Sequence, residues 1–232
     1  MRKCEHSFVS DHTTKSCISL VPIFNHLDKE KMDEIMEKVH HKMLQKGEVL
    51  YRAGDESDSL YIVQRGKIKI YRLSETGKEQ IVRILFPGDF TGELALFKQS
   101  VHDSYAEALI ETSICQIQRK DLQQFLLKYP SISLEILKEL SNRLDQSEKQ
   151  VTRFATEKVD TRIALFLAEY ANGEERMEFT LPMSKKDLAS YLGTTPETIS
   201  RKLAEFEDAG ILRQKSNKRI KILDINRLQS II

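Results

Sequence analysis

Cysteine is scarce in this chain and long hydrophobic runs are absent, and each of these features excludes a class of protein. Three cysteines in 232 residues, an odd number, argue against the disulfide framework of a small secreted domain. No apolar run approaches the roughly 20 residues that span a membrane, and the start MRKCEHSFVSDHTTK is too polar for a secretory signal. We therefore expect a cytoplasmic protein without a membrane partner.

Net charge is also small, at +1, but it is unevenly distributed along the chain. From Leu181 to Ile232 there are ten Lys and Arg against six Asp and Glu, a net of +4, which leaves −3 for the first 180 residues. A basic module at this end of the chain fits an anionic partner.

The pattern of the first 130 residues predicts an arm followed by a β-rich domain. Residues 1–21 are polar and aperiodic and include Cys4 and Cys17, which predicts a flexible arm. FNHLDKEKMDEIMEKVHHKML reads as a helix that Asp28 can cap. From Lys46, apolar and polar residues alternate in short runs between glycines, which is typical of an antiparallel barrel or roll. This domain is expected over residues 22–130.

A long helix is predicted next, over residues 131–158, where the chain has no Gly or Pro. Its apolar positions step alternately by three and four residues, which is the spacing of a coiled-coil seam. The seam is Leu137, Leu140, Leu144, Ser147, Val151, Phe154 and Lys158. A helix packed only on its own domain is the alternative, but the length of the seam favours a homodimer.

The segment SKKDLASYLGTTPETISRKLAEFEDAGIL predicts a helix-turn-helix within a domain of residues 159–232. Ser184 can cap the first helix, and Gly193 permits the sharp turn that ends it. Thr195 can cap the second helix, with Pro196 in its first position, where a missing N–H costs nothing. The first two turns of the second helix are rich in polar residues, which gives it the polar N-terminal face that a DNA-reading helix requires.

The residue types on that face fit the major groove of double-stranded DNA. Arg201 can donate two hydrogen bonds to guanine, Glu197 can accept from cytosine, and Ser200 can contact a base or a phosphate. A surface ion pair between Glu197 and Arg201 is the alternative reading. After Gly210, ILRQKSNKRIKIL predicts a hairpin with a basic tip. The remaining DNA-contact candidates are Thr195, Pro196, Thr198 and Lys202 in the helix, and Lys215, Lys218, Arg219 and Lys221 in the hairpin, or wing.

From about Pro22 to its end, the chain resembles the cyclic-AMP receptor/fumarate-nitrate reduction regulator family (CRP/FNR). The segments that carry the resemblance are KGEVLYRAGDESDSLYIVQRGKIKIY, GDFTGELAL, the long helix and LGTTPETISRKL. The resemblance implies an α+β fold with a β-roll sensor, a dimerisation helix and a winged helix-turn-helix. It further implies a regulator, not an enzyme, whose dimer reads a TGA…TCA palindrome and contacts RNA polymerase.

Cyclic-AMP-binding members have Gly-Glu in the phosphate loop, followed by an Arg-Ser pair about ten residues on. Here Gly92, Glu93 and Ser104 match these effector-pocket positions, with Ser147 on the long helix as a further candidate. The position of the phosphate-binding Arg is occupied by Asp103, and a carboxylate repels an anion. We therefore expect no binding of cyclic AMP.

The same region resembles the oxygen-sensing branch of the family, in which a cysteine after this loop and three in the arm bind an iron–sulfur cluster. Cys115 stands at the matching position, and Cys4 and Cys17 lie in the arm. A cubane cluster takes four ligands, so Asp11, His6 or His12 would have to complete the set.

Three other uses of the cysteines stay open at this point. The residues Cys4, His6, His12 and Cys17 could bind zinc, or an arm cysteine could form a reversible disulfide with Cys115. Alternatively, the cysteines are incidental and a regulator of the same family responds to a cyclic nucleotide or another small molecule. The cofactor is therefore unknown from sequence. Two rival classes of function are a cyclic-nucleotide signalling protein without a DNA role, which Asp103 opposes, and a thiol redox enzyme, which the absence of a CxxC pair opposes.

Overall fold

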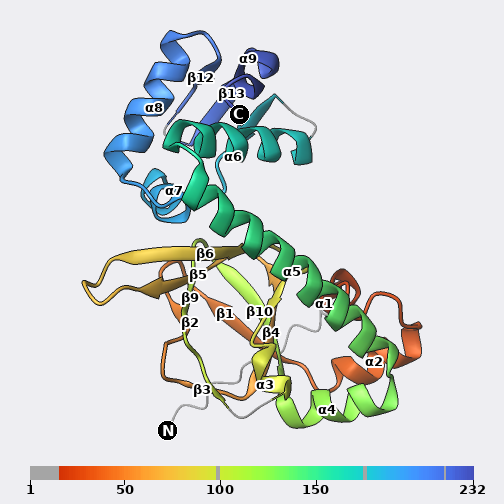
Figure 1. Ribbon diagram of the computed structural model, residues 1–232. Coiled ribbons are helices and arrows are strands. Elements are labelled where there is room, and N and C mark those ends of the chain that lie inside the picture. Colours follow the sequence, from red (N-terminus) through yellow and green to blue (C-terminus); the bar gives the residue numbers. More distant parts are fainter. Residues whose placement is uncertain (1–15, 98–99, 175–176, 217) are drawn as a thin grey trace, which may run out of the picture. The chain divides into compact units, whose positions relative to one another are not determined.

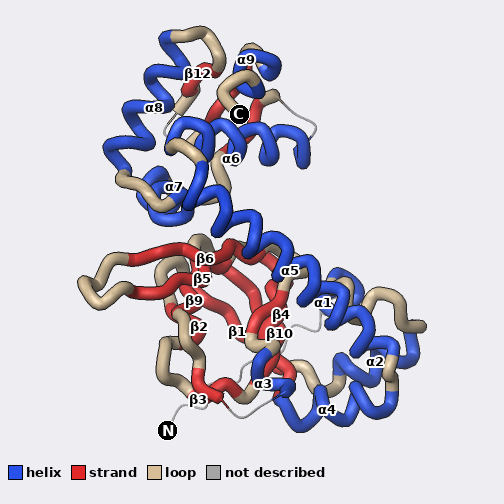
Figure 2. Tube along the Cα trace, in the orientation of Figure 1, coloured by secondary structure: helices blue, strands red, loops and turns tan. Residues whose placement is uncertain are grey.

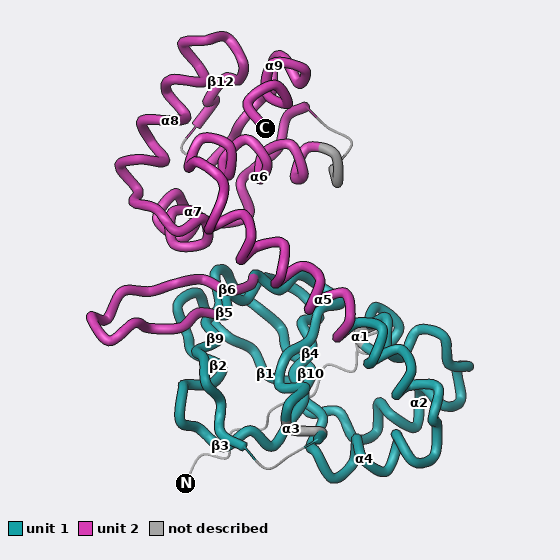
Figure 3. The backbone as a smooth tube through the Cα atoms, in the orientation of Figure 1, with its two compact units in different colours: residues 1–70, 84–139 teal, residues 71–83, 140–232 magenta. Residues whose placement is uncertain are grey.

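The computed structural model describes residues 16–97, 100–174, 177–216 and 218–232 (Figure 1). Strands predominate in the first half of the chain and helices in the second (Figure 2). The chain divides into two compact units, residues 1–70 with 84–139 and residues 71–83 with 140–232 (Figure 3). Within the described residues, no helix combines the length and apolarity needed to cross a bilayer.

The first unit is built on paired sheets, as the alternating sequence predicts. One sheet has the order β1 (His40–Leu44), β10 (Thr112–Gln118), β4 (Ser59–Arg65) and β7 (Phe90–Thr91). Another sheet has the order β2 (Val49–Tyr51), β9 (Tyr105–Ala108), β5 (Ile68–Leu73) and β6 (Glu79–Leu85), of which residues 71–83 are assigned to the second unit. In addition, β3 (Glu56–Ser57) pairs with β8 (Ser100–Val101). The helices are α1 (Ser16–Leu20), α2 (Lys29–Met36), α3 (Leu94–Phe97) and α4 (Arg119–Lys128).

The core of this unit draws buried side chains from strands of both four-stranded sheets. Leu50, Val63, Ile68 and Ile114 belong to one buried cluster drawn from four strands. The turn after β7 depends on Gly92, which has a φ of 85°, and a Cβ there would overlap the carbonyl oxygen of Ser59. Only glycine fits such a position without strain.

The predicted long helix is present as α5 (Ser131–Thr156), ending two residues before the expected boundary. It begins in the first unit, where Ile132 and Ile136 are buried, and continues into the second. The seam side chains Leu137, Leu144 and Val151 are 59%, 61% and 64% exposed. Apolar side chains at coiled-coil spacing are thus left in contact with solvent in the single chain.

The second unit contains the winged helix-turn-helix. Its elements are α6 (Val159–Glu174), β11 (Glu178–Thr180), α7 (Lys185–Leu192), α8 (Pro196–Asp208), β12 (Leu212–Gln214), β13 (Arg219–Ile222) and α9 (Ile225–Gln229). The strands form an antiparallel sheet in the order β11-β13-β12. Leu188, Leu192, Ile199, Leu203 and Phe206 are buried, so α7 and α8 pack through the apolar faces that the sequence predicts.

The second unit also includes residues 71–83, which run from the end of β5 into β6. Ser190 of α7 contacts this segment through its hydroxyl, which accepts from the backbone N–H of Ile81 at 2.9 Å and donates to the carbonyl of Glu79 at 2.8 Å. The side-chain amide of Gln80 donates to the carbonyl of Ser190 at 2.6 Å. One serine therefore satisfies two backbone groups of the edge strand β6.

Candidate nucleic-acid interface and sensor site

The turn between α7 and α8 is fixed by local hydrogen bonds. At the start of α7, Ser184 and Asp187 form a capping box, with Asp187 N donating to Ser184 Oγ at 3.1 Å. Gly193 ends this helix in the left-handed conformation, with a φ of 66°. Thr195 caps α8 by accepting from Thr198 N at 3.3 Å, and Pro196 occupies the first turn. The predicted capping roles of Ser184, Gly193 and Thr195 are confirmed.

The outward face of α8 presents the three residues expected to read bases. Glu197, Ser200 and Arg201 are all exposed, whereas Pro196 and Thr198 are partly buried. Hydrogen bonds from the backbone N–H at the helix start and from Thr195 lower the pKa of Glu197, which keeps its carboxylate ionised. An ionised Glu at this place can accept a hydrogen bond from a base edge.

Arg201 pairs along the helix with Glu205, not with Glu197. Its Nη1 lies 3.2 Å from Glu205 Oε1, and the Arg201 side chain is 63% exposed. Lys202 also pairs with Glu205, at 2.7 Å, and approaches Asp160 of α6 at 3.7 Å. Only 21% of the Lys202 side chain is exposed. Lys202 is therefore less available to DNA than its listing among the DNA-contact candidates implies.

The wing has basic side chains on the solvent face of the three-stranded sheet. Arg213, Lys215, Arg219 and Lys221 are exposed there, while Leu212, Ile220 and Ile222 are buried on the other face. Glu178 of β11 lies 2.7 Å from the Nζ of Lys215 and 2.7 Å from the Nε of Arg219. Lys218 at the tip is exposed and makes no ion pair within the described ranges.

Three of the predicted effector-pocket residues lie in the first unit. Gly92 is buried, Glu93 is partly buried, and Ser104 is 9% exposed. Asp103, which stands in place of the expected phosphate-binding Arg, is exposed. The fourth candidate, Ser147, is exposed on α5 within the second unit.

An aromatic stack that no local sequence pattern predicts lies beside this loop. His102 is 8% exposed, and its ring lies flat on that of Tyr51, with centroids 3.6 Å apart and planes 7° from parallel. The Tyr51 hydroxyl lies 2.8 Å from Thr91 Oγ1, and Tyr61 packs against both rings. Burial lowers the pKa of His102, so its imidazole is neutral and supplies no cation for a phosphate.

Cys115 is buried in β10, and it is the one cysteine whose side chain the structure describes. Its Sγ lies 3.6 Å from Nδ1 of His41, which stands opposite in the register of β1 and β10. Cys4, His6, Asp11 and His12 lie outside the described residues, and Cys17 is described only as a backbone position of α1. The described part of the chain has no cluster of three or more metal-ligating side chains.

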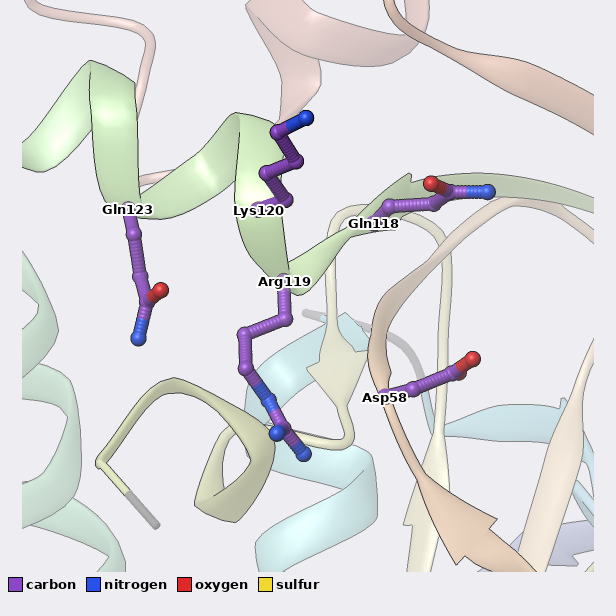
Figure 4. Close-up of a pocket in the computed structure, with 5 residues that line it drawn as sticks. All are labelled: Asp58, Gln118, Arg119, Lys120 and Gln123. Carbon is purple, nitrogen blue, oxygen red and sulfur yellow. The ribbon is translucent and has the colours of Figure 1, made fainter. Parts of the chain in front are cut away.

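A pocket of about 270 Å³ lies at the start of α4, lined by Asp58, Gln118, Arg119, Lys120 and Gln123 (Figure 4). The guanidinium of Arg119 points away from Lys120 and donates to the carbonyl of Ser57. The charged residues of the lining are one acid, Asp58, and two basic residues, Arg119 and Lys120.

Two family profiles match the chain in succession. Residues 41–129 match the cyclic nucleotide-binding domain, and residues 161–231 match the Crp-like helix-turn-helix domain. The probable transcriptional regulator flp of Lacticaseibacillus casei is 34% identical to the chain, over 92% of this chain and 97% of that protein. The chain belongs to the Crp/Fnr family of transcription regulators.

Other relatives of this Crp/Fnr regulator have names that refer to anaerobic metabolism. The anaerobic regulatory protein of Haemophilus influenzae is 33% identical, over 98% of this chain and 90% of that protein. The fumarate and nitrate reduction regulatory protein of Vibrio cholerae is 34% identical, over 89% and 83%. The structure of FixK2 from Bradyrhizobium japonicum matches with a TM-score of 0.75 and 26% identity, over 83% of this chain and 96% of that one. The predicted family and the predicted α+β architecture are confirmed.

Proposed function

We propose that this Crp/Fnr regulator acts as a homodimer on a TGA…TCA palindrome. We further propose that it responds to oxygen, redox state or a metal through its cysteines, not to cyclic AMP. The observation that carries the DNA half of the proposal is the exposed set Glu197, Ser200 and Arg201 on one face of α8. Arginine donates in pairs to guanine and glutamate accepts from cytosine, which matches the G·C pair of TGA.

The exposed seam of α5 supports the homodimer. Three large apolar side chains lie on one stripe and are each more than half exposed. Covering them with the same stripe of a second chain would remove that surface from water, which is the driving force of coiled-coil pairing. Two copies would place two α8 helices on half-sites about one helical turn apart, which accounts for a palindrome. We also propose a contact with RNA polymerase, which the family resemblance supports.

The cysteine half of the proposal rests on the pair formed by Cys115 and His41. Burial lowers the pKa of His41, so a neutral imidazole lies 3.6 Å from the thiol. A thiol and a neutral imidazole fit zinc or an iron–sulfur cluster, and they equally fit thiol oxidation, with Cys4 and Cys17 as the further ligands or disulfide partners. A bound cluster would supply sensitivity to oxygen.

A second candidate is a regulator that senses another small molecule and whose cysteines are incidental. The complete burial of Cys115 favours it, because an inaccessible thiol reacts slowly. Anaerobic purification with metal analysis, followed by DNA titration before and after oxidation, separates the two. Redox sensing predicts that oxidation changes DNA affinity and that Cys115→Ser removes the change. Equal affinity under both conditions, in protein free of iron and zinc, supports the second candidate.

A further inference from the structure

The solvent face of the wing sheet has a strong excess of positive charge. Strand alternation places four basic side chains on this face. Their apolar neighbours point to the other face and pack in the core of the domain. In this register, Glu178 stands opposite Lys221, and Lys221 stands opposite Arg213. Glu178 is the one carboxylate among the paired positions of this face.

Each carboxylate oxygen of Glu178 forms an ion pair with a different basic side chain of this face. Oε2 lies 2.7 Å from Lys215 Nζ, and Oε1 lies 2.7 Å from Arg219 Nε. The Glu178 side chain is 24% exposed, whereas Lys215 and Arg219 are 44% and 60% exposed. The Glu178 carboxylate is therefore less accessible to solvent than the two basic side chains that it pairs with.

The neighbouring basic side chains lower the pKa of the Glu178 carboxylate. The hydrogen bond from Lys215 is the largest cause of its lowered pKa, and the charges of Lys215, Arg219 and Lys221 act in the same direction. The wing thus holds a carboxylate within ion-pair distance of two basic side chains that DNA phosphates would approach. The Lys215 and Arg219 side chains of these pairs are exposed, so phosphate oxygens can compete with Glu178 for both of them.

We propose that Glu178 is an internal counterion of the wing that limits how strongly this regulator binds the phosphate backbone of any DNA sequence. Contacts to phosphates carry no information about DNA sequence. A carboxylate among the basic side chains of the wing therefore weakens specific and non-specific DNA binding together. The net charge of the Lys215–Glu178–Arg219 group is +1, and without the carboxylate it is +2. This inference rests on the proposed DNA contact of the wing.

The test compares Glu178→Gln with the parent protein on two duplexes. One contains the TGA…TCA palindrome and the other is a scrambled duplex of the same composition. Fluorescence anisotropy across a salt series should show tighter binding to both duplexes by a similar factor. The slope of log affinity against log salt should steepen by about one unit, the value for one further phosphate contact. Asp208→Asn is the matched control, because it removes an exposed carboxylate of the same domain that touches no wing base.

A second variant separates competition from positioning. Lys215→Met should weaken binding several-fold more in the Glu178→Gln background than in the parent, because only there is Lys215 wholly available to phosphate. Unchanged or weaker binding by a folded Glu178→Gln protein would overturn the inference and make Glu178 a residue that positions Arg219. If the parent fails to bind either duplex, the proposed function itself fails, and that result is distinct from a normal parent with an inert Glu178.

Discussion

His102 lies flat on Tyr51, with ring centroids 3.6 Å apart, one residue before Asp103. The backbone fixes this arrangement as well, because His102 N donates to Asp55 O and Gly54 N donates to His102 O, each at 2.9 Å. The roll of this regulator thus places a neutral aromatic stack and an acidic residue, Asp103, beside its loop. The neutral stack supplies no positive charge for an anionic effector, and the Asp103 carboxylate repels one.

The free energy of unfolding should fall in mild acid because of His102. Burial is the largest influence and lowers its pKa from 6.5, although four neighbouring carboxylates raise it: Asp55, Asp103, Asp58 and Glu93. The unfolded chain binds more protons below pH 6.5, so this contribution to stability is present above that pH and is lost as pH falls. His102→Phe keeps the stack and removes the proton, so melting temperature should vary less between pH 7.5 and 5.5.

The exposed His26 provides the control for this experiment, since His26→Gln should leave the acid sensitivity intact. Burial lowers the pKa of His41 also, so the slope should shrink and not vanish. An undiminished slope in the His102→Phe protein would show that another group is responsible.

Cyclic AMP should leave the melting temperature of the parent protein unchanged. A ligand that binds only the folded state must raise that temperature, and Asp103 replaces the cation that would hold the phosphate. Differential scanning fluorimetry over a nucleotide series measures this, with Asp103→Arg as the matched variant that restores the cation. A saturable rise in the parent protein at micromolar nucleotide would contradict the prediction.

Local signals explain why the sequence predicted the helix-turn-helix so closely. The caps Ser184 and Thr195, the turn at Gly193 and the buried face of α8 each depend on residues within one or two helical turns. The wing's alternation is local in the same way. Such features need no knowledge of distant contacts.

Contacts between distant segments could not be predicted in this way. Tyr51 meets His102, and His41 meets Cys115, only because strand register and loop closure bring them together. Even within α8 the pairing was missed, since both Glu197 and Glu205 lie four residues from Arg201. The helix start and Thr195 engage Glu197, and the ion pair forms with Glu205.

Dimer formation should depend on the exposed seam of α5. Changing Leu144 and Val151 to Glu places like charges at the centre of the proposed interface, and both positions are exposed in the single chain, so the fold should survive. Sedimentation equilibrium should report half the parent mass, and operator affinity should fall, because each monomer sees one half-site. Asn142→Glu, exposed on the same helix outside the seam, is the control. An unchanged mass in the double variant would refute the seam.

Base reading should depend on Arg201. Replacing it with Ala removes the paired donors for guanine and should cost about 1–3 kcal/mol on the intact palindrome, with relaxed preference at that base pair. Lys218→Ala, at the unpaired wing tip, should instead weaken all sequences alike and flatten the salt dependence. Glu205→Gln leaves Arg201 in place and should retain the preference for guanine. Selection from randomised duplexes with each purified dimer measures all three. A consensus without TGA and TCA arms, or unaltered discrimination by Arg201→Ala, would show that other residues of α8 read the operator.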